Sequence, residues 1–110
     1  MIILPGIKQW SEGSTAKHEN AVNFTPYLRS TETFTGTPTI AEVAGTSDLT
    51  ITNKIVNSSV MEIGSNQVAI GKAIAFFVAG HKAGKQYLIQ ITCTTSAGQV
   101  LVFGVRAEGV

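Results

Sequence analysis

Short runs of β-forming residues, each bounded by turn residues, recur along this chain and constrain its fold more than any other feature. In the most regular run, Gln86–Thr94, Tyr87, Ile89, Ile91 and Cys93 alternate with polar residues. Leu88 is an apolar exception on the second face. This period of two predicts a strand with one buried face. No window longer than ten residues keeps apolar residues at helical spacing between capping residues. The sequence therefore predicts an all-β protein.

The other runs predict further strands at the spacing of about 8–12 residues that is typical of a β-sandwich. We expect them at Asn20–Phe24, Thr31–Thr35, Thr39–Ala44, Leu49–Asn53, Met61–Ile63 with Gln67–Ile70, Ala73–Ala79 and Gln99–Ala107. The loop from Thr95 to Gly98 joins the last two strands as a hairpin. A chain of 110 residues is expected to form one domain, and we predict an immunoglobulin-like antiparallel β-sandwich of about 7–8 strands over residues 19–110.

Tyr87 supports this fold through its position in the chain. Immunoglobulin-like domains often carry a tyrosine at the start of the penultimate strand, two residues before a core position, and its hydroxyl bonds back to the preceding corner. Tyr87 follows Gly84 closely and precedes Ile89 by two residues, so we predict that it is a structural corner. An ordinary tyrosine on a half-buried strand face is the alternative.

The last predicted strand carries apolar residues on both of its faces. Leu101, Phe103 and Val105 share one face, whereas Val100 and Val102 begin the other. This pattern indicates contact with something besides the strand's own core. Charged residues form 14% of the chain, against about 25% in soluble domains. Such a composition agrees with a surface covered by partners, and equally with a surface kept soluble by Thr and Ser.

Residues 1–18 differ from the rest, because turn residues surround one short apolar group. We predict an extended N-terminal arm, with Ile7 and Trp10 as candidate partner-docking residues. Trp10 either covers the sandwich of its own chain or inserts into a pocket of a neighbouring subunit. Removal of residues 1–14 is expected to leave a folded domain that no longer assembles.

The sequence has no pattern typical of a catalytic or cofactor-binding site. His18 and His81 are the only histidines, and neither accompanies a Gly-x-Ser-x-Gly elbow. Cys93, the single cysteine, alternates into the predicted core. Asp48 is the only aspartate and the glutamates are dispersed, so neither paired carboxylates nor a calcium loop is expected. We predict a protein that is not an enzyme and binds no cofactor.

Neither the charge nor the N-terminus predicts binding to nucleic acid or to membranes. The formal net charge is +1, which provides no general attraction for either. Lys72, His81, Lys82 and Lys85 are expected to form a basic rim at one end of the sandwich, and we interpret them as solvated loop residues rather than a contact for DNA or an acidic partner. The N-terminus has no signal-peptide pattern, and the longest apolar run, Ala73–Ala79, is too short to span a bilayer.

Three segments between Lys72 and Arg106 carry a resemblance to a known family. They are a strand that ends in glycine at 75–80, a Gly-x-x-Tyr step at 84–87, and a Thr-Thr-Ser-x-Gly turn at 94–98. In this order they resemble the phage fibre-tail adaptor proteins, a family of small immunoglobulin-like structural proteins. A weaker match covers residues 20–28. Residues 38–66 depart from the family, since they lack the tryptophan often found in its second strand.

The resemblance implies a bacteriophage virion structural protein, an adaptor that links a tail fibre or appendage to the tail or portal region. The implied partners are other virion proteins, namely fibre, tail or portal (connector) components, and the implied assembly is a homo-oligomer of symmetry-related copies. The expected location is the virion, after synthesis in the bacterial cytoplasm. A capsid decoration or cement protein and a carbohydrate- or ligand-binding β-sandwich are the alternatives.

Overall fold

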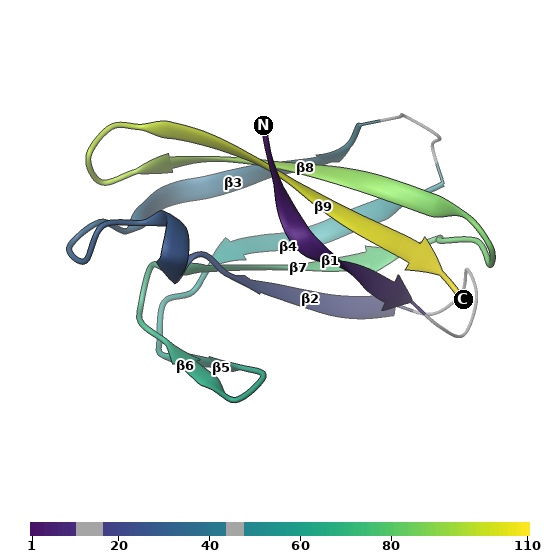
Figure 1. The fold of residues 1–110 in the computed structure, drawn as a ribbon, viewed down its shortest axis with the longest axis horizontal. Coiled ribbons are helices and arrows are strands. Elements are labelled where there is room, and N and C mark those ends of the chain that lie inside the picture. Colours follow the sequence, from purple (N-terminus) through teal and green to yellow (C-terminus); the bar gives the residue numbers. More distant parts are fainter. Residues whose placement is uncertain (11–16, 44–47) are drawn as a thin grey trace.

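The computed structural model describes residues 1–10, 17–43 and 48–110, and its regular structure is almost entirely β-strand (Figure 1). The longer strands form two facing layers, and the small β5–β6 hairpin lies outside them. The elements of the described residues are β1 (Ile2–Trp10), β2 (Lys17–Asn23), a 3₁₀ helix η1 (Thr25–Tyr27), β3 (Phe34–Glu42), β4 (Thr50–Val56), β5 (Met61–Ile63), β6 (Asn66–Val68), β7 (Ala73–Ala79), β8 (Gln86–Thr95) and β9 (Val100–Gly109).

The order of the strands is that of an immunoglobulin-like sandwich. One sheet has the order β1-β9-β8-β3, and the facing sheet has the order β2-β7-β4. In the order in which they lie in their sheet, β2, β7 and β4 correspond to the B, E and D strands of an immunoglobulin domain, and β3, β8 and β9 of the other sheet correspond to C, F and G. The predicted all-β immunoglobulin-like sandwich is confirmed.

Most of the predicted strands coincide with observed ones. β5 and β7 have the predicted bounds, and β8 and β9 differ from them by one or two residues at their ends. Thr31–Thr35 and Thr39–Ala44 are wrong as separate strands, because the single strand β3 begins at the end of the first range and continues to Glu42, with a register shift between Thr35 and Thr39. Gly36 has φ of 71°, a conformation that other residues rarely adopt. The turn residues of this stretch therefore mark a bulge, and Ala44 lies outside the described residues.

The N-terminal segment Ile2–Trp10 is a strand, so the prediction of an extended arm is wrong there. β1 pairs in parallel with β9 along most of its length. Leu4 and Trp10 are buried in the core, and the burial of these two apolar groups explains why the segment lies on the sheet. Residues 11–16 of the predicted arm lie outside the described residues, and Lys17 already belongs to β2.

Alternating side chains of the central strands fill the core between the two sheets. Ile89 and Ile91 of β8 and Phe103 of β9 are fully buried, and they cluster with Phe76 of the facing strand β7. Phe24, which follows β2, packs its ring on Phe103 with 4.6 Å between the ring centroids. The alternate apolar residues of β8 that the sequence predicted to be buried are therefore the ones that pack in the core.

Candidate functional site

Tyr87, near the start of β8, forms a corner with the loop that precedes the strand. Its phenol oxygen accepts a hydrogen bond from the backbone N–H of Lys82 at 2.9 Å and donates one to the Asp48 carboxylate at 3.1 Å. The Tyr87 ring is buried, and Ile89 lies in the core. These are the contacts expected of a structural corner, so Tyr87 holds the β7–β8 loop against the sandwich.

Asp48 forms salt bridges with two lysines at this end of the sandwich. Its side chain is 8% exposed, and its carboxylate lies 3.0 Å from Lys85 Nζ and 3.3 Å from Lys82 Nζ. The hydrogen bond from Lys85 holds the pKa of Asp48 below its ordinary value of 3.8. Bonds from Tyr87 and Lys82 act in the same direction, whereas burial opposes them. The cluster therefore stabilises the charged carboxylate and ties the start of β4 to the corner.

We expect Asp48→Asn to lower the free energy of unfolding at neutral pH much more than in acid. The pKa of Asp48 is lowered in the folded protein, so the stabilisation by its charge is fully present above the unfolded value near 3.8 and is lost as the pH falls through the folded value. Urea unfolding from about pH 7 to about pH 3 should show the gap between wild type and variant narrowing below about pH 4. Glu62→Gln, at an exposed residue of β5, is the control. A gap of constant size over this range would contradict the prediction.

The four basic residues predicted to form one rim do not lie together. Lys72 precedes β7 and His81 follows it, so the length of the strand separates them. Lys72 is buried, and its Nζ donates to two backbone carbonyl oxygens of the loop before β3, at 2.8 and 3.3 Å. His81 is fully buried. The prediction of a basic rim is wrong, because only Lys82 and Lys85 are exposed at one end, and both contact Asp48.

Trp10, one of the two predicted docking residues, belongs to the protein's own core. Its side chain is 2% exposed, and its Nε1–H donates to Asn20 Oδ1 at 3.0 Å. Its ring packs against the rings of His81 and Tyr87, with centroids 5.6 and 6.0 Å away. Of the two predicted alternatives, the structure has Trp10 covering its own sandwich. Ile7, the other docking residue, is 50% exposed and stays a candidate contact.

Ile7 belongs to an apolar surface on the outer side of the β1-β9-β8-β3 sheet. Ile3 and Leu88 meet there over Gly104, since a Cβ at Gly104 would lie 2.6 Å from Ile3 Cδ1 and 3.3 Å from Leu88 Cδ1. Val102 lies on the same side of β9 as Gly104, two residues away. Met1 lies there too, with its Sδ 3.1 Å from the same Cβ position at Gly104. We call the following residues the outer apolar face: Met1, Ile3, Ile7, Leu88 and Val102. The sequence indicated its β9 part, but its β1 part was missed because that segment was interpreted as an arm.

Reactive side chains do not converge on a catalytic site within the described residues. The rings of His18 and His81 lie 5.2 Å apart. Cys93 is buried in the core, and burial raises the pKa of its thiol. Over 1–10, 17–43 and 48–110, no three His, Cys, Asp or Glu side chains are grouped so as to hold a metal ion. The same residues contain no helix long and apolar enough to cross a membrane.

By its strand order this chain is a small immunoglobulin-like β-sandwich protein. No protein-family model matches the sequence, and no curated protein matches it.

Proposed function

We propose that this chain is a structural adaptor of a bacteriophage particle, which joins a fibre or appendage to the tail or portal region and has no catalytic role. The outer apolar face carries the proposal. A sheet that buries one face in its own core normally presents a polar face to water, and a cluster of exposed apolar side chains on that second face indicates a protein partner. The resemblance of residues 72–106 to the fibre-tail adaptor family supplies the kind of partner.

The composition of the outer apolar face supports a protein contact. Arg106 of β9 is exposed and lies opposite Ile7 of β1 on one side and Leu88 of β8 on the other. Protein interfaces combine an apolar centre with a polar rim, and arginine is enriched among the residues that contribute most to binding. The arrangement thus has both parts of a binding surface.

Exposed aromatic rings, which would favour the carbohydrate-binding alternative, are not a feature of this surface. All Trp, Tyr and Phe side chains lie in the described residues, and each is buried or half-buried. The outer apolar face presents aliphatic side chains instead. Aliphatic groups stabilise a contact by burial against another apolar surface, which favours a protein partner over a sugar.

We expect Leu88→Asp to lower incorporation of the chain into particles by at least about tenfold, because a carboxylate at the centre of an apolar contact loses its water without gaining a partner. The measurement is quantitative mass spectrometry of purified particles in which the variant replaces the wild-type chain. Val60→Asp is the matched control, since Val60 is 59% exposed but precedes β5, away from the outer apolar face.

Two results would contradict the proposal in different ways. A wild-type chain that is missing from purified particles would exclude a virion role. Normal incorporation of a folded Leu88→Asp variant would show that the outer apolar face is not the contact. The copy number adds a third measurement, since a ring of roughly 6 to 12 copies fits an adaptor, whereas hundreds of copies fit the capsid decoration alternative.

A further inference from the structure

β2 is the least protected of the strands at the sheet edges. The edges of the two large sheets are β1, β3, β2 and β4, and edge strands commonly avoid pairing with other chains through bulges, prolines and charges. β1, β3 and β4 each contain a register shift. β2 pairs with β7 in unbroken register from Lys17 to Asn23. Its charged residues, Lys17 and Glu19, lie in the first half, so 20–23 has neither a bulge nor a charge.

The backbone groups of Ala21 and Asn23 point away from β7. Phe24, directly after β2, donates its N–H to the carbonyl oxygen of Lys72 at 2.9 Å, which continues the ladder between β2 and β7. Residues of an antiparallel ladder alternate between those that bond to the partner strand and those that do not. Val22 therefore bonds to β7, while the N–H and C=O groups of Ala21 and Asn23 face the open side.

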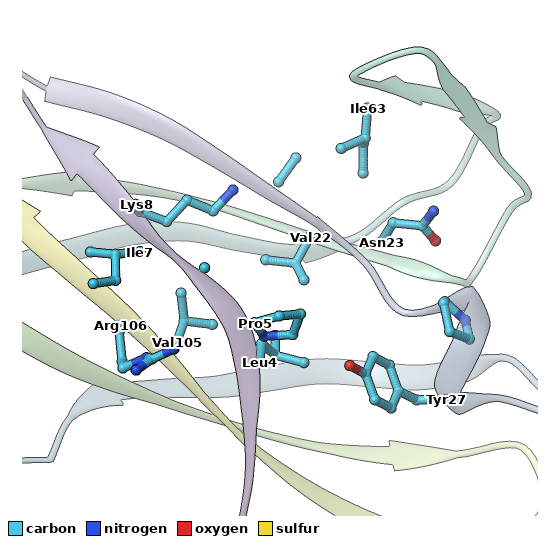
Figure 2. Close-up of a pocket in the computed structure, with 13 residues that line it drawn as sticks. Leu4, Pro5, Ile7, Lys8, Val22, Asn23, Tyr27, Ile63, Val105 and Arg106 are labelled. Carbon is cyan, nitrogen blue, oxygen red and sulfur yellow. The ribbon is translucent and has the colours of Figure 1, made fainter.

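A groove of about 440 Å³ lies along this part of β2, between it and β1 (Figure 2). Leu4 and Pro5 of β1 form one side, and Val22 of β2 points toward them from the other. Tyr27 of η1 lies at one end of the groove, and Val105 of β9 is also part of its lining. An extended segment paired with β2 would place every second side chain in this apolar groove.

Two basic side chains give the groove a positive charge. Lys8 and Arg106 both line it, and Figure 2 shows the Lys8 side chain extending from β1 toward β2. Within the part of the chain that the structure describes, neither residue forms a salt bridge, and no carboxylate is among the lining residues. A carboxylate on an incoming segment would therefore meet unneutralised cations at this site.

We propose that the open edge of β2 and the adjoining groove bind an extended segment of a partner protein by strand addition. The segment has apolar residues at alternate positions and an acidic residue at the end near Lys8. This inference goes beyond the proposed function, because the site is separate from the outer apolar face and the two adjoin only at Ile7 and Arg106. The substitutions in the test avoid both of these residues.

The probe is the end-blocked peptide Glu-Thr-Val-Thr-Val-Thr-Glu, whose valines and terminal glutamates share one face and whose two glutamates suit either strand direction. We expect an NMR titration to show binding to the wild-type chain with the largest shifts in Ala21–Asn23. A peptide with lysine at both ends should bind at least about tenfold more weakly. N-methylation of one alternate set of peptide nitrogens should weaken binding about tenfold, and N-methylation of the other set should not, because only one edge of the peptide pairs with β2.

Two substitutions test the same site from the side of the chain. Ala21→Pro removes an N–H that faces the open side, where proline is tolerated in an edge strand, and it should weaken peptide binding at least about tenfold. Lys8→Glu should weaken binding as much without touching the ladder, so the test stands even if Ala21→Pro does not fold. Lys54→Glu, in β4 at the opposite edge, is the matched control and should bind as the wild type does.

Several results would overturn the inference. They are the absence of peptide binding to the wild-type chain, equal effects of the two N-methylated peptides, and wild-type affinity in Lys8→Glu. The chain could instead form a dimer that the peptide does not displace and that Ala21→Pro abolishes. That result would assign the β2 edge to a second copy of the chain. Leu88→Asp should bind the peptide normally, so a failure of the proposed function and a failure of this site are distinguishable.

Discussion

Gly80→Ala is expected to lower the free energy of unfolding by about 3 kcal/mol or more. Gly80 follows β7 with φ of 89°, and a Cβ at this position would lie 2.1 Å from the backbone oxygen of Asp48. Relief of this overlap would displace Asp48. The same movement would pull its carboxylate away from Tyr87 and Lys85, so the substitution would disturb the corner as well as the turn.

Substitutions at two other glycines distinguish the backbone strain from the overlap of the added Cβ. Gly98 has φ of 82° with nothing within 4 Å of the added Cβ, so Gly98→Ala should cost about 1 kcal/mol from backbone strain alone. Gly109 lacks a positive φ, but its Cβ would lie 2.1 Å from the Lys82 carbonyl oxygen, so Gly109→Ala isolates the overlap. Urea unfolding followed by Trp10 fluorescence measures all three. A Gly80→Ala variant no less stable than Gly98→Ala would refute the prediction.

The sequence predicted those strands whose alternation is enforced by burial on one face. β7 and β8 are central, and their inward residues, such as Ile74 and Ile89, are fully buried. β1 escaped prediction because it is an edge strand in which only Leu4 and Trp10 are buried. Its register shift lies between Ile3 and Ile7, where Pro5 and Gly6 resemble a turn. Local pattern alone does not distinguish a bulged edge strand from a flexible arm.

The sequence pattern indicated part of the outer apolar face but neither the Asp48 cluster nor the open β2 edge, because only the first depends on a local alternation of residues. Leu88 and Val102 stood out because a strand with a clear buried face leaves any apolar residue on its other face conspicuous. The contacts of Asp48 join residues 37 and 39 positions apart, and no local spacing indicates them. The open edge of β2 depends on which strands are neighbours, which is a property of the topology and not of any single segment.

Trp10→Ala is expected to lower the free energy of unfolding by about 4 kcal/mol. The substitution removes a fully packed indole that contacts the rings of His81 and Tyr87, and the cavity that remains adds to the lost burial. It also leaves Asn20 Oδ1 without the N–H that it accepts at 3.0 Å, which carries a further cost in a buried site. Urea unfolding followed by far-UV circular dichroism is the measurement, since the variant has no tryptophan.

Trp10→Phe is the matched control, because it keeps an aromatic ring and removes the N–H, and it should cost about 1–2 kcal/mol. The free energies of unfolding of the two variants, compared with the wild type, decide whether Trp10 packs in its own domain or docks on a neighbouring subunit. If Trp10 served a neighbouring subunit, both variants would unfold like the wild type and only assembly would weaken. Since Trp10 fixes β1 to the sandwich, we expect the Trp10 variants to lose stability, and not only assembly. For the same reason, removal of residues 1–14 should unfold the domain instead of leaving it folded.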